Sequence, residues 1–406
     1  IDAIMDEDAG NQQSSQKKWN KIRLRSEAEA NTMKKVLILT ASTGEGHNAA
    51  ARSLELKFKE AGYETRTMDL FKETSRALNV VVEDGYKVLA NRLPSLYGFI
   101  YRAFNRKSIN HLFLRYSMFV IKRRLYDNVK SLNPSIIVGT HPFAVGIISD
   151  LKSRGKIQAK FFSVVTDFKA HYAYLSPEVD AYITGSEYTK ESLMEMGVPA
   201  EIIHPYGIPV NEEFQNYQPK SPEFLKLIED FKVLVMGGSM GSKDIAKVVQ
   251  SLTESEARYQ LLVICGRNET LKTMLESNYQ DAIASGKLKV YGFTKEVSKL
   301  MDLCDVIVTK PGGLTTTEAL SKRIPMIVPF AIPGQEFENT EFLIETGAAI
   351  YVDNIEQIGE ELERLRKDKA LYLSMIESMD NISRHYSTEK IVDLADQLLI
   401  KNEWMA

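Results

Sequence analysis

The amino-acid sequence predicts an α/β protein built from two Rossmann-like, doubly wound domains that face a cleft. The first observation is that short apolar runs of strand length alternate with longer segments of helical periodicity, as in parallel sheets covered by helices. The second is that this plan starts twice, at residues 35–39 and at residues 232–236, each time followed by a glycine-rich turn. The third is a polar, proline-containing stretch at residues 212–222, which is typical of a linker.

These observations divide the chain into five parts. Residues 1–32 are rich in Gln, Ser, Lys and Glu without apolar periodicity, so we expect a disordered extension or a remnant outside the fold. Residues 33–211 form the first domain, residues 223–385 the second, and residues 212–222 the linker. Residues 386–406 contain apolar residues at helical spacing, which predicts a C-terminal helix that packs back on the first domain.

Composition limits the setting in which the protein works. The chain has two cysteines and no secretory leader ahead of Met33, which predicts a reducing cytoplasmic environment. No apolar run approaches the roughly 18 residues that a membrane-spanning helix needs. Residues 33–211 carry 24 Lys and Arg against 17 Asp and Glu, whereas residues 212–406 carry 22 against 31. The first domain is therefore expected to face an anionic partner.

A glycine loop follows the first predicted strand and leads into a helix. Gly44, Gly46 and Ala49 match the dinucleotide fingerprint G-x-G-x-x-G/A, and Asp69 stands where a ribose-binding acid would. A nicotinamide cofactor is therefore one interpretation. His47 favours another, because a ring beside the second glycine would crowd a pyrophosphate but could act on a ligand across a cleft. A surface histidine after a glycine turn is the third, and the loop lacks the Gly-Lys-Ser/Thr of a Walker motif.

The segment from Tyr97 to Lys130 combines aromatic and basic residues, with eight Lys and Arg against one acid. Such helices can lie in a lipid interface, with rings at the level of the headgroups and cations on anionic phosphates. The commoner explanation for any one helix is that the rings belong to the core and the charges to a solvated face. Nucleic acid would attract the same charges, but no recognised nucleic-acid motif accompanies them. The residues expected to contact an anionic membrane surface are Tyr101, Arg102, Phe104, Arg106 and Lys107.

Polar residues follow two further predicted strands of the first domain. His141 follows one strand, and Asp167 and His171 follow the next. Because ligands of doubly wound sheets bind outside the carboxyl ends of the strands, these side chains and His47 should converge on one place. Any one of them taken alone could be structural.

The second domain contains the most informative stretch of the chain. A predicted strand stops at residues 311–313 (Pro-Gly-Gly) and the chain restarts as a threonine-rich helix. Free N–H groups and hydroxyls at such a helix N-terminus favour an anion, so we expect a phosphate there. Glu318 falls about one turn into the helix, within reach of a ribose diol beside the phosphates. The ligand is therefore expected to be a nucleotide, with Gln335, Glu336 and Asn339 around its far end.

A set of short motifs resembles glycosyltransferase family 28 and, within it, the diacylglycerol glycosyltransferases of the processive beta-glucosyltransferase and monogalactosyldiacylglycerol synthase type. The resemblance covers residues 33–400 and implies a GT-B fold, with a UDP-sugar bound by the second domain in the cleft. The motifs are Gly-Glu-Gly-His-Asn at 44–48, Thr-His-Pro-Phe at 140–143, Thr-Asp-Phe at 166–168, Met-Gly-Gly-Ser-Met-Gly at 236–241, Pro-Gly-Gly-Leu-Thr-Thr-Thr-Glu-Ala at 311–319 and Pro-Gly-Gln-Glu-Phe-Glu-Asn at 333–339.

Roles for individual residues follow from the motifs and the resemblance together. His47 and Asp167 are expected to be catalytic, and Gly46, His141 and His171 are expected on the acceptor side. Glu336 stands where related enzymes that transfer an acetamido sugar tend to carry a second Gln. The expected donor-binding residues are Gly238, Ser239, Met240, Gly266, Phe293, Val297, Gly312, Gly313, Thr315, Thr316, Glu318, Gln335, Glu336 and Asn339.

The implied chemistry is an inverting sugar transfer, which needs a base to take the proton of the acceptor hydroxyl. A histidine has the pKa range for this task, and His47 is the expected base. Asp167 is either a rival base or the carboxylate that orients a histidine. Helix N-termini and threonine hydroxyls can stabilise the leaving UDP without a metal. Residues 33–406 contain no Asp-x-Asp pair, so no metal or other cofactor is expected.

Three functions remain open at this point. The first is transfer of a hexose, glucose before galactose, from its UDP ester to diacylglycerol by a peripheral enzyme on the cytoplasmic face of the cell membrane. The second keeps the fold but uses a polyprenyl-linked acceptor or epimerises the UDP-sugar. The third is a regulatory protein that senses a UDP-sugar and binds a protein partner.

Overall fold

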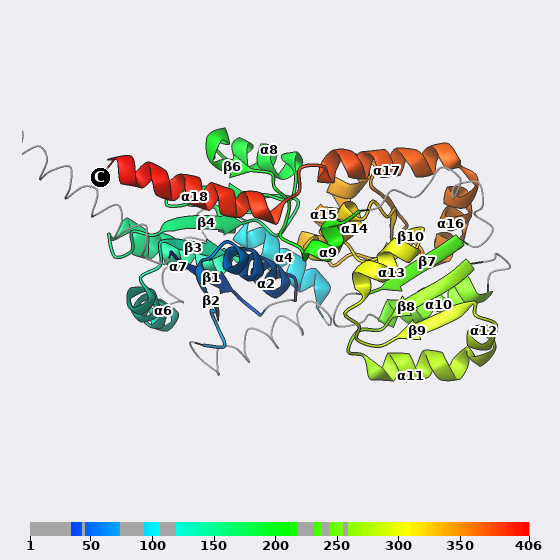
Figure 1. Ribbon diagram of the computed structural model, residues 1–406. Helices are drawn as coiled ribbons and strands as arrows, with labels where there is room; N and C mark the ends of the chain where they lie inside the picture. Colours follow the sequence, from blue (N-terminus) through cyan, green and yellow to red (C-terminus); the bar gives the residue numbers. More distant parts are fainter. Residues whose placement is uncertain are drawn as a thin grey trace, which may run out of the picture.

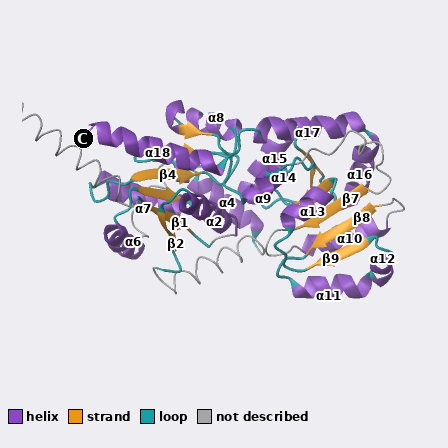
Figure 2. Ribbon diagram, in the orientation of Figure 1, coloured by secondary structure: helices purple, strands orange, loops and turns teal. Residues whose placement is uncertain are grey.

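The computed structural model describes residues 34–42, 45–73, 93–105, 119–217, 231–237, 243–254 and 259–405. These residues form two lobes, each with a parallel sheet of six strands between helices (Figure 1). Figure 2 shows the strands of both lobes enclosed by helical layers. The predicted fold class, two doubly wound α/β domains, is confirmed.

The first sheet contains strands that follow the apolar runs of the sequence. They are β1 (Lys35–Thr40), β2 (Glu64–Asp69), β3 (Ile136–Gly139), β4 (Lys160–Val164), β5 (Ala181–Ile183) and β6 (Ile203–His204). Their order is β2-β1-β3-β4-β5-β6, and all neighbours are parallel. The order reverses between β1 and β3, so the carboxyl ends of these two strands flank the crevice where doubly wound sheets bind ligands.

The helices of the first lobe place functional residues at that edge of the sheet. α2 begins at Glu45, within the predicted glycine loop, so His47 lies in its first turn. The helix between β3 and β4 starts at Pro142, directly after His141. The helices are α2 (Glu45–Glu60), α4 (Pro94–Phe104), α6 (Phe119–Leu132), α7 (Pro142–Ser153), α8 (Glu187–Glu195), η1 (Tyr172–Tyr174) and η2 (Ala200–Ile202).

The second sheet repeats the plan with a different strand order. Its strands are β7 (Phe231–Met236), β8 (Tyr259–Ile264), β9 (Leu288–Tyr291), β10 (Val306–Thr309), β11 (Met326–Val328) and β12 (Ala349–Tyr351). The order is β12-β11-β10-β7-β8-β9, again with parallel neighbours. The order reverses between β7 and β10, which places the chain after β10 at the ligand crevice of this lobe. β12 is a short edge strand that the sequence analysis did not predict.

Helices cover both faces of the second sheet. They are α10 (Lys243–Glu254), α11 (Glu269–Asn278), α12 (Gln280–Ala284), α13 (Val297–Leu303), α14 (Gly313–Ser321), α15 (Gln335–Glu345), η4 (Ile355–Gln357), α16 (Ile358–Lys367) and α17 (Lys369–Ser383). α14 follows β10 and α15 follows β11, so both begin at the carboxyl edge of the sheet. Within the described ranges, no helix has both the length and the apolar character needed to cross a bilayer.

The last helix, α18 (Thr388–Met405), returns to the first lobe, where Figure 1 shows it in red along the helices and strands of that lobe. Its Ile391 and Ala395 are fully buried in one cluster with Leu54 and Phe58 of α2. Burial of such aliphatic side chains stabilises the contact by about 1.5–3 kcal/mol for each large residue. The two lobes are thus connected at the linker and again through α18.

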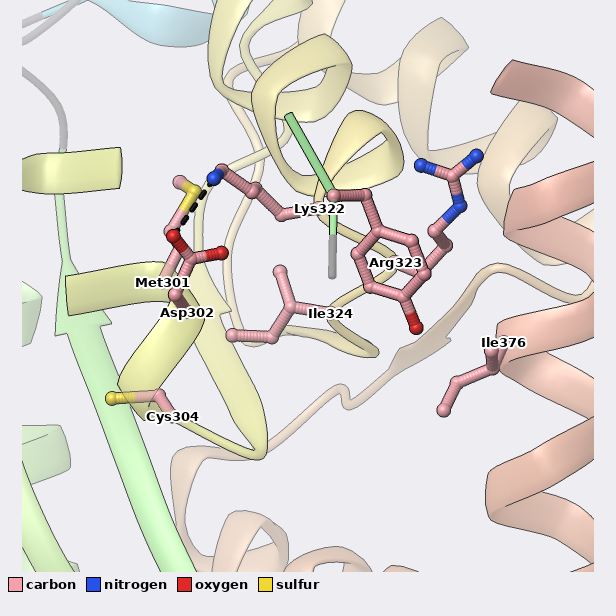
Figure 3. Close-up of a pocket in the computed structure, with 8 residues that line it drawn as sticks. Met301, Asp302, Cys304, Lys322, Arg323, Ile324 and Ile376 are labelled. Atoms are coloured by element: carbon pink, nitrogen blue, oxygen red, sulfur yellow. Dashed lines mark hydrogen bonds and ion pairs between the residues drawn. The ribbon is translucent and has the colours of Figure 1, made fainter. Parts of the chain in front are cut away.

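The linker is anchored to the second lobe around a cavity of about 200 Å³ (Figure 3). A short helix, α9 (Glu212–Gln215), starts the crossing. The Lys322 ammonium lies 2.8 Å from the Asp302 carboxylate and 3.3 Å from the Asn216 carbonyl oxygen. The Arg323 guanidinium lies 4.4 Å from the centre of the Tyr217 ring. None of the predicted site residues lines this cavity.

Candidate active site

His47 lies at the carboxyl end of β1, where its ring is fixed by backbone. Its Nδ1 lies 2.7 Å from the Thr140 carbonyl oxygen at the end of β3. Because a carbonyl oxygen can only accept, Nδ1 carries the hydrogen and Nε2 keeps its lone pair. Burial lowers the pKa of His47 to about 4, although the bond to Thr140 opposes that shift. The ring is therefore neutral near pH 7 and presents Nε2 as a base.

The His141 ring packs edge-on against the His47 ring, with the ring centres 4.5 Å apart. His141 is the N-cap of α7, and its Nδ1 accepts a hydrogen bond of 3.2 Å from the Phe143 N–H. Burial, together with the nearby His47, holds its pKa well below the ordinary value. His141 is thus neutral, and it supports one side of the His47 ring.

Both ring nitrogens of His171 contact backbone groups. Its Nδ1 accepts from the Ala173 N–H at 3.0 Å, which caps η1, and its Nε2 lies 3.3 Å from the Tyr101 carbonyl oxygen. This arrangement differs from the expected acceptor contact, because both nitrogens already have backbone partners. In the described structure His171 fixes α4 to the end of β4.

Asp167 is buried at the end of β4 and is contacted from both lobes. Its Oδ2 accepts a hydrogen bond of 3.2 Å from the Tyr174 hydroxyl, and its Oδ1 accepts one from the Gln335 amide of the second lobe. Burial raises the pKa of Asp167 to about 7; the Tyr174 hydroxyl opposes the shift, and the charge of Glu338 adds to it. Asp167 therefore titrates near neutral pH.

Two residues that the sequence analysis did not select connect His47 to Asp167. The Thr166 hydroxyl lies 3.1 Å from His47 Nδ1 and 2.9 Å from the Tyr174 hydroxyl. Thr166 has a signal in the sequence, since it precedes Asp167 at the end of a predicted strand. Tyr174 has none, because its position depends on how η1 folds back against β4.

The start of α14 faces the start of α2 across the boundary between the lobes. A Cβ atom built on Gly46 would lie 3.6 Å from Leu314 Cβ, and one built on Gly313 would collide with the Thr166 carbonyl oxygen. The N-termini of both helices, where N–H groups lack partners within the helix, therefore lie in the same interlobe region. This is where the sequence predicted the reacting groups to meet.

The first turn of α14 has the chemistry of an anion site. The Thr316 hydroxyl oxygen is buried and has no hydrogen-bond partner in the described part of the chain. Thr315 is partly exposed beside it, and Gly312 is the N-cap residue. A buried hydroxyl without a partner costs free energy unless a ligand supplies one, so this orphan oxygen fits a phosphate oxygen. Gly238, Ser239 and Met240, which are also expected to bind the donor, lie outside the described residues.

Glu318 lies one turn into α14, and no hydrogen bond to its carboxylate comes from the described residues. Burial, with the charge of Glu213 adding to it, raises its pKa to about 8. A half-buried carboxylate of this kind fits the donors of a ribose diol. The ribose contact of Glu318 stays a prediction.

The three polar residues at the start of α15 differ in what they contact. Gln335 donates to Asp167 across the boundary between the lobes. Glu336 is paired with the Lys310 ammonium at 2.5 Å and accepts from the Ile332 N–H at 3.0 Å. Asn339 accepts from Phe168 N–H at 3.0 Å and donates to a carbonyl of the β10–α14 turn at 2.9 Å. Glu336 therefore holds the loop before α15, Asn339 connects the two lobes, and Gln335 faces the catalytic candidates.

Phe293, one of the expected donor-binding residues, is exposed and has a cation beside its ring. The Phe293 ring is 57% exposed, and the Arg267 guanidinium lies 5.2 Å from its centre. Arg267 also pairs with Glu45 of α2 at 3.3 Å, a contact between the lobes that the sequence did not indicate. Gly266 has a positive φ of 60°, which favours glycine, and Val297 starts α13.

The first glycine loop does not support the nicotinamide interpretation. The Asp69 carboxylate accepts from the Ser42 hydroxyl at 2.5 Å and from the backbone N–H groups of Phe71 at 2.9 Å and Lys72 at 3.0 Å. Its oxygens thus close the turn after β2, so they are not placed for a ribose. Gly44 lies outside the described residues.

The predicted membrane segment requires one correction. The Tyr101 hydroxyl donates to Glu338 of α15 at 2.8 Å, and its ring lies 4.7 Å from the His171 ring, so Tyr101 faces the second lobe rather than solvent. Arg102 is exposed as expected, and the apolar residues on the exposed side of α4 are Leu96 and Phe99. The Phe104 side chain, Arg106 and Lys107 lie outside the described part of the structure.

One lobe has a histidine at its crevice, and the other has a helix N-terminus with threonines and a carboxylate at its crevice. Two doubly wound lobes with these features define a GT-B glycosyltransferase. The chain belongs to glycosyltransferase family 28, together with the processive diacylglycerol beta-glucosyltransferases. Residues 47–210 match the family model described as monogalactosyldiacylglycerol (MGDG) synthase, and residues 232–398 match the glycosyltransferase family 28 C-terminal domain.

Relatives of known name cover nearly the whole chain. Processive diacylglycerol beta-glucosyltransferase of Bacillus pumilus is 31% identical over 383 residues, which is 90% of this chain and 96% of the relative. The enzyme of the same name from Bacillus subtilis is 31% identical over 372 residues, 89% of this chain and 95% of the relative. The family and the class of enzyme, a glycosyltransferase, are thereby established.

Solved structures agree on the fold. MurG of Acinetobacter baumannii superposes with a TM-score of 0.59 at 17% identity, over 90% of this chain and 99% of that chain. The glycotransferase of kitacinnamycin superposes with a TM-score of 0.61 at 12% identity, over the same shares of the two chains. At these identities the likeness establishes the fold alone.

Proposed function

We propose that this protein transfers a hexose, glucose in preference to galactose, from a UDP-sugar to diacylglycerol, with inversion at the anomeric carbon. The observation that carries the proposal is that the first turn of α2, which contains His47, lies against the first turn of α14 across the interlobe boundary. A base on one lobe and an anion site on the other are the two parts that the reaction needs. The names of the relatives support glucose as the sugar and diacylglycerol as the acceptor.

The proposed reaction is a single displacement. His47 Nε2 takes the proton of the acceptor hydroxyl while the hydroxyl oxygen attacks the anomeric carbon and the bond from that carbon to the phosphate oxygen breaks. The departing UDP gains negative charge, which the α14 N-terminus and the Thr316 hydroxyl stabilise. We propose that no metal is required, because these groups already supply the stabilisation that a metal would.

The membrane contact is proposed for the outer side of α4. Leu96 is 45% exposed and Phe99 is 65% exposed, and Arg102 is exposed on the same helix. Apolar side chains beside a cation suit the interface of an anionic lipid surface. A peripheral enzyme on the cytoplasmic face of the membrane would meet diacylglycerol there.

The test is product analysis with the purified full chain. UDP-glucose and UDP-galactose, each with a labelled hexose, are incubated with anionic vesicles that contain or lack diacylglycerol, with and without EDTA. We expect label in the lipid fraction only when diacylglycerol is present, more from glucose than from galactose, and no effect of EDTA. UDP release that needs no lipid would favour epimerisation or another acceptor. Tight UDP-sugar binding without turnover would favour the sensor.

His47→Ala tests the proposed base. We expect kcat to fall by roughly 100-fold or more, the range of general-base catalysis, with an unchanged Kd for UDP because His47 acts on the acceptor. His385→Ala is the control, since His385 is an exposed histidine of the second lobe. A loss of UDP affinity in His47→Ala would instead place this ring in the donor site.

A further inference from the structure

A continuous chain of hydroxyl groups joins His47 to Asp167, which do not bond to each other directly. His47 Nδ1 is 3.1 Å from the Thr166 hydroxyl, that hydroxyl is 2.9 Å from the Tyr174 hydroxyl, and the latter is 3.2 Å from Asp167 Oδ2. Thr166, Asp167 and Tyr174 are all buried. The chain is therefore shielded from water, which strengthens each of its hydrogen bonds.

The direction of the hydrogen bonds follows from the two ends. At one end the Thr140 carbonyl oxygen can only accept, so His47 Nδ1 carries its hydrogen toward Thr140 and Thr166. At the other end an ionised Asp167 can only accept, so the Tyr174 hydroxyl donates to it, and Thr166 donates to Tyr174. Burial and the charge of Asp167 raise the pKa of Tyr174 well above its ordinary value, so its hydroxyl keeps the proton. Every donor in the chain then points toward the carboxylate.

This chain of hydroxyl groups can compensate for the weakness of His47 as a base. Burial makes His47 a weak base, and its nearest aromatic neighbour, His141, is neutral and supplies no negative charge. The imidazolium that forms when His47 takes a proton needs a nearby anion. Asp167 is that anion, and the two hydroxyls carry its influence to Nδ1 by polarisation of successive hydrogen bonds.

A residue of the second lobe contacts Asp167, the carboxylate at the end of the hydrogen-bond chain. Gln335, at the N-terminus of α15, donates to Asp167 Oδ1 and so favours the ionised carboxylate. The other groups that face Asp167 are Tyr174 of η1, Glu338 of α15 and Tyr101 of α4. Glu338 opposes ionisation by its charge, whereas the Tyr174 hydroxyl favours it.

We propose that Thr166 and Tyr174 are positioning residues that couple Asp167 to His47, and that the Gln335 contact makes the strength of the base depend on the second lobe. The inference rests on the proposed role of His47 as the acceptor base. Above the pKa of Asp167, about 7, the carboxylate accepts from Tyr174 and stabilises the imidazolium. Below it, the protonated carboxyl can donate back to Tyr174, which reverses the chain and weakens the base.

Tyr174→Phe, which removes one hydroxyl and keeps the ring, tests this coupling in the full chain. We expect kcat to fall about tenfold, equivalent to about 1.4 kcal/mol of transition-state stabilisation, with KM for the UDP-sugar unchanged. In the wild type we expect kcat to rise with pH near 7. In Tyr174→Phe this rise should disappear, and only the change in kcat at lower pH that comes from titration of His47 should remain. Tyr182→Phe is the control, because Tyr182 is equally buried and, within the described residues, its hydroxyl bonds only to the Ser176 backbone.

Thr166→Val and Thr166→Ser form a second pair, since the first breaks the chain and the second keeps the hydroxyl. We expect Val to reproduce the Tyr174→Phe pH profile and Ser to restore that of the wild type. A variant that loses rate but retains the rise near pH 7 would overturn the inference, because a structural role alone lowers the rate without moving the profile. Equal profiles for Val and Ser would overturn it as well.

A measurement without turnover separates this inference from the proposed function. In protein labelled with ¹⁵N-histidine, the His47 signals, assigned with His47→Gln, should show a second inflection near pH 7 that reports Asp167. The inflection should be absent in Tyr174→Phe and present in Tyr182→Phe. Its absence in the wild type overturns the coupling, even if transfer to diacylglycerol is observed. Its presence supports the coupling, even if the acceptor proves to be a different lipid.

Discussion

Glu318 illustrates how a single residue can lower the stability of the folded protein and yet be suited to binding a ligand. Its carboxylate is partly buried, receives no hydrogen bond from the described residues, and lies near the charge of Glu213. Its pKa is raised to about 8 for these reasons. Unsatisfied carboxylates with raised pKa values are typical of ligand sites, where the substrate supplies the missing donors. The two hydroxyls of a ribose are such donors.

Glu318→Gln is expected to gain stability and lose affinity. Between the ordinary pKa of 4.5 and the folded-state value of about 8, the folded protein binds more protons at Glu318 than the unfolded chain does. The free energy of unfolding contributed by this residue therefore decreases as pH rises through that window. The variant removes this penalty, so its Tm should exceed that of the wild type at pH 8 but not at pH 4.5. Thermal unfolding at both pH values tests this.

Above pH 8, where the Glu318 carboxylate is ionised, the same variant should bind UDP about tenfold more weakly, because a hydrogen bond to a charged group contributes about 1.5–3 kcal/mol. Isothermal titration calorimetry with UDP measures it. Glu360→Gln, at an exposed glutamate of α16, is the matched control for both experiments. An unchanged Kd for UDP would show that the ribose lies elsewhere.

The residues of the site divide into those that the sequence could predict and those that it could not. His47, His141 and Asp167 lie in the segments that follow apolar strands, and parallel strands end at a common edge, so their convergence was predictable. Tyr174 joins them only because η1 folds back after β4, and nothing in its local pattern indicates that contact. Tyr101 was expected to meet lipid, but its hydroxyl bonds to Glu338, a residue more than two hundred positions away in the chain. Long-range packing of this kind leaves no local periodicity to read.

The α4 helix contacts the second lobe on one side and carries the proposed membrane contact on the other. On its inner side, a Cβ atom built on Gly98 would lie 2.8 Å from Pro333 Cβ, so the helix packs closely on the loop before α15. Gly334 in that loop has a positive φ of 107° and lies against the Tyr101 ring. On its outer side, Leu96 and Phe99 are exposed. One helix therefore contacts the loop that carries Gln335 and presents apolar side chains to the surroundings.

Replacing Leu96 and Phe99 together by Ser is expected to weaken membrane binding. Each side chain contributes about 1.5–3 kcal/mol when fully buried, so a partial insertion of both should reduce co-sedimentation with anionic vesicles about tenfold. Leu373→Ser is the control, since Leu373 is 41% exposed on α17 of the second lobe. UDP binding and circular dichroism should be unchanged in both variants. Equal sedimentation of the double variant and the wild type would mean that this face of α4 does not contact lipid.

The two lobes meet through buried groups as well as surface charges. Asn339 is completely buried, and its amide bonds the end of β4 to the turn before α14. The Phe168 and Phe342 rings stack with their centres 4.5 Å apart across the same boundary. The sequence predicts two domains because each has its own alternation of strands and helices. It does not predict how they meet, because that depends on a few side chains from each lobe.

Gly313 offers a sharp test of that contact, since adjacent glycines in one motif differ in their surroundings. A Cβ atom on Gly313 would collide with the backbone carbonyl oxygen of Thr166 in the first lobe, whereas one on Gly312 would meet nothing within 4 Å. Backbone cannot move aside as a flexible side chain can, so Gly313→Ala should push α14 away from β4. Overpacking of this kind costs about 1–3 kcal/mol. We therefore expect a lower Tm for Gly313→Ala and an unchanged Tm for Gly312→Ala.

Gly313→Ala and Gly312→Ala should also differ in transfer activity and in radius of gyration. Because displacement of α14 also moves it away from Thr166, the hydroxyl next to His47, Gly313→Ala should lose most of the transfer activity. Small-angle X-ray scattering should give a larger radius of gyration for Gly313→Ala than for the wild type and Gly312→Ala. If both variants kept the wild-type Tm and radius of gyration, the close approach of β4 and α14 would not hold the lobes together. The proposed reaction would then need a different arrangement of the lobes to bring His47 to the donor sugar.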